Sequence, residues 1–199
     1  MLHRRPSAMP SRTAARILVG AGALALSTSL APAAHAAPAA PQRLLATTTL
    51  YYDDSQAAEF KSAVAAGAAA WNSSVQNVRL VKAPAGRRAE IRVIADNGWP
   101  RATLGPVRPG GQVTVWFGRQ AVAEGYNTTR IASHEMGHSL GLPDRKPGPC
   151  SSLMSGSTGG VSCTNALPNA SERAAVESNY ASAAVAAPAG AGRILVDAP

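Results

Sequence analysis

The chain has 199 residues, of which 46% are hydrophobic and 15% charged, and its formal net charge is +8. That length suggests one domain with short additional segments. Four arginines fall within the first 36 residues, so residues 37–199 carry only +4, spread along the sequence. There is no nucleic-acid-binding motif and no basic amphipathic helix, which argues against nucleic acid or a membrane surface as a partner.

The first 36 residues have the three parts of a secretory signal peptide. The four arginines (Arg4, Arg5, Arg12 and Arg16) form a positive N-terminal region, residues 17–30 are apolar, and residues 34–36 (Ala-His-Ala) offer a cleavage site. The apolar run is shorter than the roughly 20 residues that a transmembrane helix needs, so a membrane anchor is the weaker alternative. Pro6 after Arg4-Arg5 favours general secretion over twin-arginine export. We therefore expect an extracellular, monomeric protein that does not stay in the membrane.

The remaining chain divides by composition into three parts. Residues 37–47 contain two prolines and read as a short pro-segment or linker. Residues 48–181 alternate strand-like and helix-like patterns and are expected to form the folded domain. Residues 182–199 are rich in alanine and are expected to fray or to be removed.

In chain order, the patterns of the folded domain predict a small α+β fold with a mixed sheet. The predicted strands cover residues 47–52, 78–81, 91–95 and 112–118, with long loops at 97–111 and 141–168. Three helices are predicted: one from Asp53 or Asp54 to Trp71, one beginning at Asn127 or Thr128, and one over residues 169–181. Phe60, Val64, Ala68 and Trp71 give the first helix a buried stripe, and Asn169 with Glu172 resembles a capping box at the start of the last.

The two cysteines, Cys150 and Cys163, both follow the signal peptide. In an oxidising exterior such a pair most often forms a disulfide, which would contribute roughly 3 kcal/mol of stability. Two zinc-binding thiolates are the weaker alternative, because no C-x-x-C spacing accompanies them.

The stretch HEMGHSLGLPD, residues 134–144, carries the chemistry. On a helix, His134 and His138 lie about 40° apart around the axis and about 6 Å along it, so both imidazoles can reach one ion. Glu135 projects differently and can reach a water beside that ion, which is the logic of the H-E-x-x-H motif. Each residue alone could be an ordinary surface, core or helix-start residue, but together they predict a zinc centre with Glu135 as general base.

Two further residues complete the expected centre. Gly141 can adopt positive φ and end the helix, so that the chain turns back and Asp144 supplies a third zinc ligand. That leaves the fourth position open, as a catalytic zinc requires, because the other two histidines, His3 and His35, lie in the signal peptide. Met154 in a Ser/Gly-rich loop is expected to pack beneath the histidines, with ordinary core filling as the alternative.

The pattern H-E-x-x-H-x-x-G-x-x-D followed by a methionine turn resembles the metzincin metalloproteases, and within them the snapalysin family of small secreted actinobacterial zinc endopeptidases. The resemblance covers nearly the whole predicted domain and rests on Tyr52-Asp53, residues 71–75 (WNSSV), His134 to Asp144, residues 148–150 (GPC), 153–156 (LMSG), 162–165 (SCTN), 168–170 (PNA) and Glu172-Arg173. It implies a metzincin-like zincin domain with an active-site helix, a Met-turn and a C-terminal helix. It also implies that Cys150 and Cys163 pair around the Met-turn.

The resemblance implies further features, with departures. The family binds a structural calcium ion through an aspartate and a threonine before the zinc helix, and the matching positions here are Asn127 and Thr129, so the charged ligand is missing. Asp144 is followed by Arg145-Lys146, where relatives carry a histidine and a tyrosine.

Substrate is expected to lie extended along an edge strand, which the resemblance places at residues 112–118. No cysteine precedes Cys150, so latency is expected from residues 37–47 or from another protein rather than from a thiolate.

The function predicted from these residues is secreted, zinc-dependent hydrolysis of peptide bonds in proteins. A secreted zinc-binding module without protease activity is the alternative, and loss of Glu135 would have been its signature. A purely structural zinc domain is a third reading, which would require a fourth protein ligand.

Overall fold

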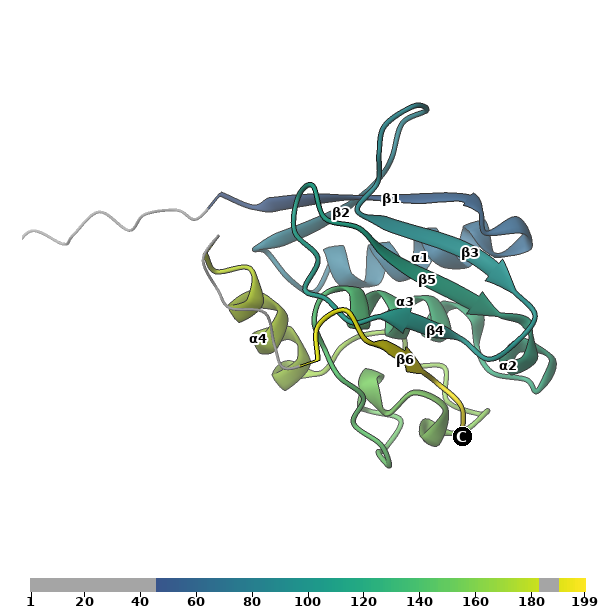
Figure 1. The fold of residues 1–199 in the computed structure, drawn as a ribbon. Helices are drawn as coiled ribbons and strands as arrows, with labels where there is room; N and C mark the ends of the chain where they lie inside the picture. The colour runs from purple at the N-terminus through teal and green to yellow at the C-terminus, as the bar shows by residue number, and fades with distance from the viewer. Residues whose placement is uncertain (1–45, 183–189) are drawn as a thin grey trace, which may run out of the picture. The chain divides into compact units, whose positions relative to one another are not determined.

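The computed structural model describes residues 46–182 and 190–199, which contain a six-stranded sheet in the order β2-β1-β3-β5-β4-β6 (Figure 1). The predicted signal peptide and nearly all of the predicted pro-segment lie outside the described residues. Among the helices of the described residues, none combines the length and the apolar character needed to cross a membrane.

The strands confirm the expected mixed sheet. β1, β2, β3 and β5 run parallel to one another, whereas β4 pairs antiparallel with β5, and β6 pairs antiparallel with β4. Their bounds are β1 Thr48–Gln56, β2 Val78–Lys82, β3 Ile91–Asp96, β4 Arg101–Thr103, β5 Val113–Gly118 and β6 Ile194–Val196.

Two predictions about this sheet are wrong. β4 lies inside the segment 97–111 that was expected to be loop, because three residues pair with β5 despite the surrounding glycines, prolines and arginines. As a consequence, β5 lies between β3 and β4 and its backbone is paired on both sides. Residues 112–118 therefore cannot be the edge strand for substrate, and β4 is the strand next to the outer edge.

The three predicted helices are present, but the first begins later than expected, and residues 119–123 and 153–159 form two further helices that the sequence did not predict. The helix bounds are η1 Ala58–Phe60, α1 Lys61–Asn72, α2 Arg119–Ala123, α3 Thr128–Ser139, η2 Leu153–Gly159 and α4 Ala170–Asn179. Asp53 and Asp54 do not cap the first helix; both belong to β1, which continues to Gln56. The segment stays in the sheet because Asp53 and Gln56 pair with β3. Asp54 is buried, and its carboxylate lies 2.9 Å from Lys82 Nζ on the neighbouring strand.

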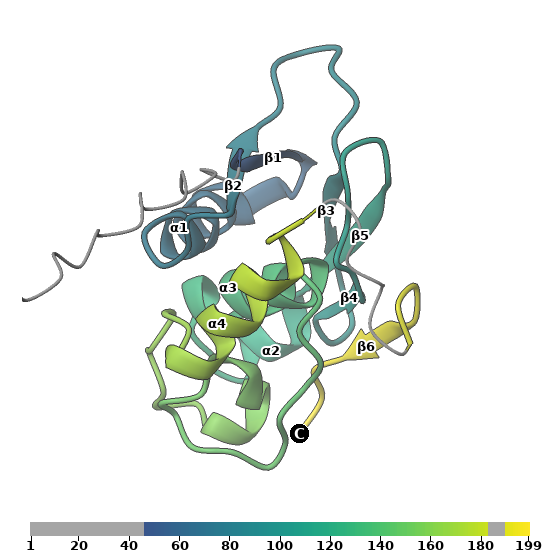
Figure 2. The ribbon, with the colours of Figure 1, turned by 90° about the vertical axis from the view of Figure 1, so that its left-hand side faces the viewer.

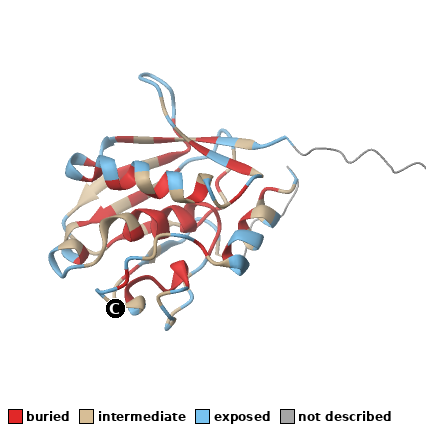
Figure 3. Cartoon of the chain, turned by 180° about the vertical axis from the view of Figure 1, so that it is seen from behind, coloured by how far each residue is buried: buried red, intermediate tan, exposed pale blue. Residues whose placement is uncertain are grey.

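Helices α1 and α3 pack side by side on one face of the sheet, and buried residues run the length of α3 (Figure 3). The predicted stripe of α1 is buried, and Phe60 stacks on Phe117 of β5 with ring centroids 4.1 Å apart. The indole N–H of Trp71 donates to the Ser133 carbonyl of α3 at 2.8 Å. A Cβ on Gly67 would lie 2.8 Å from the Ala132 Cβ, so glycine is what permits the close approach of the two helices.

The Met-turn (Leu153–Gly156) lies within the 3-10 helix η2, is buried and contacts α3. A Cβ on Gly137 would lie 2.7 Å from Met154 Sδ, so the thioether packs on α3 between the positions of the two histidines. Met154 is therefore buried against the helix that carries both histidines, and its role as a floor beneath them stays a prediction.

The end of the chain departs from the sequence-based expectation. Of the predicted tail, residues 183–189 lie outside the described residues, but residues 190–199 are not frayed: Ile194–Val196 form β6 on the outer edge of β4 (Figure 2). The backbone groups of β4 that face outward are satisfied by this pairing. Three consecutive large apolar residues, with high strand propensity, explain why this part of an alanine-rich tail joins the sheet.

Asn127 is the N-cap of α3, because its side-chain oxygen accepts a hydrogen bond from the Arg130 N–H at 2.9 Å. Asn127→Ala should lower the free energy of unfolding by about 1 kcal/mol, measured by urea denaturation, because that N–H loses its acceptor. Asn127→Asp keeps the acceptor and should stay close to the parent. Equal losses in the two variants would show that the cap contributes nothing.

Gly137→Ala should lower the free energy of unfolding by about 1–3 kcal/mol, because the added methyl overlaps Met154 Sδ, although alanine favours a helix more than glycine does. Met154→Leu removes the thioether and should recover part of the loss. A double-mutant cycle by urea denaturation measures this coupling, and strictly additive losses would contradict the contact.

Candidate metal centre

Helix α3 presents three of the predicted site residues, and its ends are defined by local interactions. Gly141 has φ +97, and the Leu142 N–H donates to the Gly137 carbonyl, so the helix stops and the chain turns back. This turn brings Asp144 to the two histidines on the last turns of α3, as the sequence predicted.

The three candidate ligands converge on one point. Asp144 Oδ1 lies 3.4 Å from His134 Nε2 and 3.5 Å from His138 Nε2, longer than good hydrogen bonds. Ligand atoms of all three residues lie within 4.8 Å of one another. The two imidazole rings are nearly perpendicular, at 84°, with centroids 4.6 Å apart.

The far side of each imidazole is held by a backbone carbonyl. His134 Nδ1 lies 3.0 Å from the Leu153 carbonyl oxygen, and His138 Nδ1 lies 2.7 Å from that of Leu142. Because a carbonyl can only accept, each Nδ1 carries a proton, and in the neutral imidazole each Nε2 then presents its lone pair toward Asp144. This is the arrangement that metal-binding histidines use.

The unpartnered polar atoms test whether a metal fits. Six buried side-chain atoms have no hydrogen-bond partner among the described residues, and five belong to this cluster: Nε2 of both histidines, both Glu135 carboxylate oxygens and Asp144 Oδ1. Buried polar atoms without partners cost free energy unless a ligand satisfies them. Two imidazole nitrogens and one carboxylate oxygen are the donor set of a three-ligand zinc site, so the residues fit zinc.

The pKa shifts of the cluster's side chains also favour a bound cation. Burial raises the pKa of Glu135 well above its ordinary value. Burial alone would lower the pKa of His134, but the carboxylates of Asp197 and Asp144 outweigh it and raise that pKa to about 9. Burial would also raise the pKa of Asp144, yet the two histidines hold it below its usual range. Several carboxylates thus share a buried space that favours a cation.

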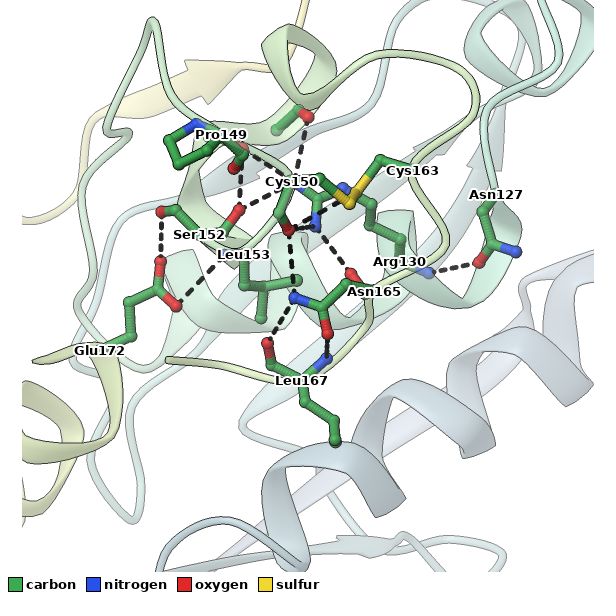
Figure 4. The surroundings of a disulfide bond; sticks show 12 residues. Asn127, Arg130, Pro149, Cys150, Ser152, Leu153, Cys163, Asn165, Leu167 and Glu172 are labelled. Atoms are coloured by element: carbon green, nitrogen blue, oxygen red, sulfur yellow. Dashed lines mark hydrogen bonds between the residues drawn. A yellow bond between two sulfur atoms is a disulfide. The ribbon is translucent and has the colours of Figure 1, made fainter. Parts of the chain in front are cut away.

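Arg130, one turn before His134, was missed by the sequence analysis because an arginine on a helix is normally a surface residue. Its guanidinium is buried and donates to the carbonyls of Asn165 at 2.7 Å and Ser152 at 2.9 Å, and to Ser155 Oγ at 2.9 Å (Figure 4). It therefore joins α3 to the Met-turn and to the loop that follows.

Glu172 was predicted only as part of a capping box, which the structure confirms. Its buried carboxylate also accepts from the backbone N–H groups of Met154 at 2.9 Å and Leu153 at 3.2 Å, and from Ser152 Oγ at 2.7 Å. The cap of α4 and the Met-turn beneath the histidines therefore share one carboxylate.

The predicted disulfide between Cys150 and Cys163 is present and closes the loop that contains the Met-turn (Figure 4). The alternative of two zinc-binding thiolates is therefore excluded. The Cys150 carbonyl also accepts a hydrogen bond from the Asn165 amide at 3.2 Å.

Asp197 is the second residue of this region that the sequence analysis missed. Its Oδ2 lies 3.9 Å from His134 Nε2, and ligand atoms of His134, Glu135 and Asp197 lie within 4.8 Å of one another. No local motif marks it, because it reaches the cluster only through the pairing of β6 with β4.

Comparison with known proteins agrees with the geometry. A family profile described as the Streptomyces extracellular neutral proteinase (M7) family matches residues 47–183. The chain is 42% identical over 135 residues to the extracellular small neutral protease of Streptomyces caespitosus, an alignment covering 68% of this chain and 98% of that protein.

Two longer relatives carry the same name. The protein of Streptomyces coelicolor is 41% identical over 133 residues, covering 67% of this chain and 60% of the relative. That of Streptomyces sp. (strain C5) is 40% identical over 149 residues, covering 75% of this chain and 63% of the relative. The chain thus matches somewhat less than two thirds of the length of these two proteins.

A solved structure of high choriolytic enzyme 1, a hatching enzyme zinc-protease from Oryzias latipes (medaka fish), aligns with 49% of this chain and 46% of that chain, at 23% identity and a TM-score of 0.37. That likeness is too partial to support an argument. The match over residues 47–183, which contain the whole candidate centre, is decisive: the chain belongs to the Streptomyces extracellular neutral proteinase (M7) family.

Proposed function

We propose that this chain is a secreted, zinc-dependent endopeptidase that hydrolyses peptide bonds in proteins. The observation that carries the proposal is the convergence of His134, His138 and Asp144 within 4.8 Å, with their facing atoms unpartnered. Membership of a family of extracellular neutral proteinases supports both the activity and the location.

His134, His138 and Asp144 are proposed to hold zinc. When bound there, zinc lowers the pKa of an adjacent water and polarises the substrate carbonyl. The protein's contribution is to hold both imidazoles in the tautomer and orientation that present Nε2, through the Leu153 and Leu142 carbonyls.

Glu135 is proposed as the general base. It follows His134 directly, and neither of its carboxylate oxygens has a hydrogen-bond partner among the described residues, so both are free to accept a proton. Because burial raises the pKa of Glu135, its carboxylate is a stronger base than an exposed one. It takes a proton from the attacking water as the water oxygen bonds to the scissile carbonyl carbon, and then gives that proton to the leaving amine.

The substrate backbone is proposed to pair with β4. β5 is paired with β3 and β4, whereas the outer side of β4 is paired only with the short strand β6 of the C-terminal segment. An extended peptide can add to β4 by β-augmentation in place of that segment.

The alternative, a zinc-binding module without activity, is less well supported, because Glu135 is present, buried and unpaired within the cluster. Calcium plays no part in the proposal. Asn127, at one of the two positions matched to a calcium ligand, uses its side-chain oxygen as the N-cap of α3, and Thr129 stays an untested prediction.

Glu135→Gln should lower casein hydrolysis by about 10²–10⁴-fold, because the amide cannot take up the proton. Zinc content, measured by atomic absorption, should stay at one ion per chain, and a chelator should abolish the parent activity. Because Asp197 lies against His134, each assay is repeated in an Asp197→Ala background.

Glu124→Gln, which removes an exposed acid on the turn after α2, is the matched control and should hydrolyse casein as the parent does. Hydrolysis that survives either Glu135→Gln or chelation would refute the mechanism. A protein that binds zinc but hydrolyses nothing, in either background, would favour the binding-module reading.

A further inference from the structure

The C-terminal segment occupies the strand edge that a substrate would use. Residues 194–196 pair antiparallel with 101–103, in the register Arg101 to Val196 and Thr103 to Ile194 (Figures 1 and 2). Three hydrogen bonds extend the pairing beyond the strand. Leu104 N–H donates to the Arg193 carbonyl at 2.7 Å, Gly192 N–H to the Leu104 carbonyl at 2.7 Å, and Asp197 N–H to the Pro100 carbonyl at 2.9 Å. A peptide cannot pair with β4 while this segment is there.

The side-chain carboxylate of Asp197, which follows β6, lies against the candidate metal centre. The Asp197 side chain is only 6% exposed, and its Oδ2 faces His134 Nε2 at 3.9 Å. Its Oδ1 accepts from the Ser157 N–H at 2.9 Å and pairs with Lys146 Nζ at 2.6 Å. Asp197 is therefore held between the Met-turn region on one side and the residues after Asp144 on the other.

The surroundings of Asp197 form a built receptor. A side chain on Gly156 would overlap the Asp197 carboxylate, so the glycine leaves the space that the carboxylate fills. The Ala198 carbonyl accepts from Lys146 Nζ at 2.7 Å and from Ser157 Oγ at 2.9 Å. Lys146 thus makes two contacts to the tail, one to Asp197 and one to Ala198.

The rest of the segment is not built like a core strand. Ile194 and Val196 remain 54% and 50% exposed, and Leu195 is only partly buried. The segment is therefore attached by backbone hydrogen bonds and by the polar contacts of Asp197 and Ala198, as a bound peptide is, rather than by burial of apolar side chains. Such attachment is separable from the fold, whereas a core strand is not.

We propose that residues 190–199 are a built-in inhibitor, which covers the β4 edge and places the Asp197 carboxylate beside His134 and Glu135, where the reacting carbonyl of a substrate has to lie. The inference rests on the proposed function. With zinc held by His134, His138 and Asp144, the Asp197 carboxylate beside His134 would compete with water and substrate for the ion, so the chain is latent until the segment leaves. The proposal assigns latency to the C-terminal segment, and the expectation that residues 37–47 or another protein contributes to latency stays a prediction.

Docking of the segment can be measured without activity, by trypsin digestion of the zinc-free full chain. Cleavage after Arg193 releases residues 194–199, and because a docked strand resists proteolysis, the release rate followed by mass spectrometry reports undocking. Cleavage at the exposed Arg87-Arg88 turn in the same sample is the internal reference.

Asp197→Ala and Lys146→Met should each speed the release of residues 194–199 by roughly tenfold relative to cleavage at Arg87-Arg88, because each breaks a charge-assisted contact of the tail. The Glu124→Gln control should change neither rate. Acceleration at both sites alike would overturn the proposal, because it would make β6 an integral part of the fold and the centre a closed, structural one.

Inhibition is measured on the zinc-loaded full chain. Asp197→Ala should hydrolyse casein at least tenfold faster than the parent, and a synthetic peptide of residues 190–199, at millimolar concentration, should inhibit that variant. The same peptide carrying Asp197→Asn should inhibit far less. A parent as active as Asp197→Ala, with its tail still protected from trypsin, would overturn the proposal.

The two proposals fail in different ways. Selective release of the tail with no hydrolysis in any variant would refute the proposed protease function, while the docking of Asp197 would stand. Hydrolysis that is chelator-sensitive and equal in the parent and in Asp197→Ala would support the protease and refute the inhibitor.

Discussion

The burial of α3 is the constraint on which the rest of the structure depends. Every residue from Arg130 to Ser139 is buried, although this stretch carries an arginine, a glutamate and two histidines. A helix in that position is stable only if its polar groups find partners inside the protein. Arg130 finds carbonyls and a serine hydroxyl, and each histidine finds one carbonyl for Nδ1. Most of the buried side-chain atoms left without partners in the described residues lie at one point, which makes that point the candidate metal centre.

The same need for partners links distant segments into one support for the histidines. Glu172 at the start of α4 accepts from the backbone of the Met-turn, and the Leu153 carbonyl of that turn orients His134. Arg130 binds the turn from the other side, and the disulfide closes the loop around it. Imidazole orientation is therefore set by a network of buried charges and backbone groups, which is the kind of preorganisation that a catalytic centre requires.

The outer side of β4, next to the centre, can pair either with a substrate peptide or with the protein's own C-terminal segment. β4 offers outward-facing backbone groups close to α3, and any extended chain can satisfy them. In this structure the protein's own C-terminal segment does so, and it delivers a carboxylate to the imidazole cluster. Peptide binding and tail docking are mutually exclusive because they use the same hydrogen-bonding groups.

The sequence by itself determined the features that depend on local spacing. His134, Glu135 and His138 follow from helical periodicity, Gly141 and Asp144 from the turn after the helix, and Cys150 with Cys163 from an exported chain that has only these two cysteines. The α+β class, with most of its strands and helices, followed from hydrophobic patterns for the same reason.

Only the tertiary structure decided the rest: that Asp54 stays in a strand, that residues 101–103 join the sheet, that Arg130 is buried and that Asp197 reaches the site. Each of these depends on partners distant in the chain, such as Ser157 for Asp197, forty residues away. No local pattern encodes such a contact, because its free energy exists only once the sheet and α3 have brought the two segments together.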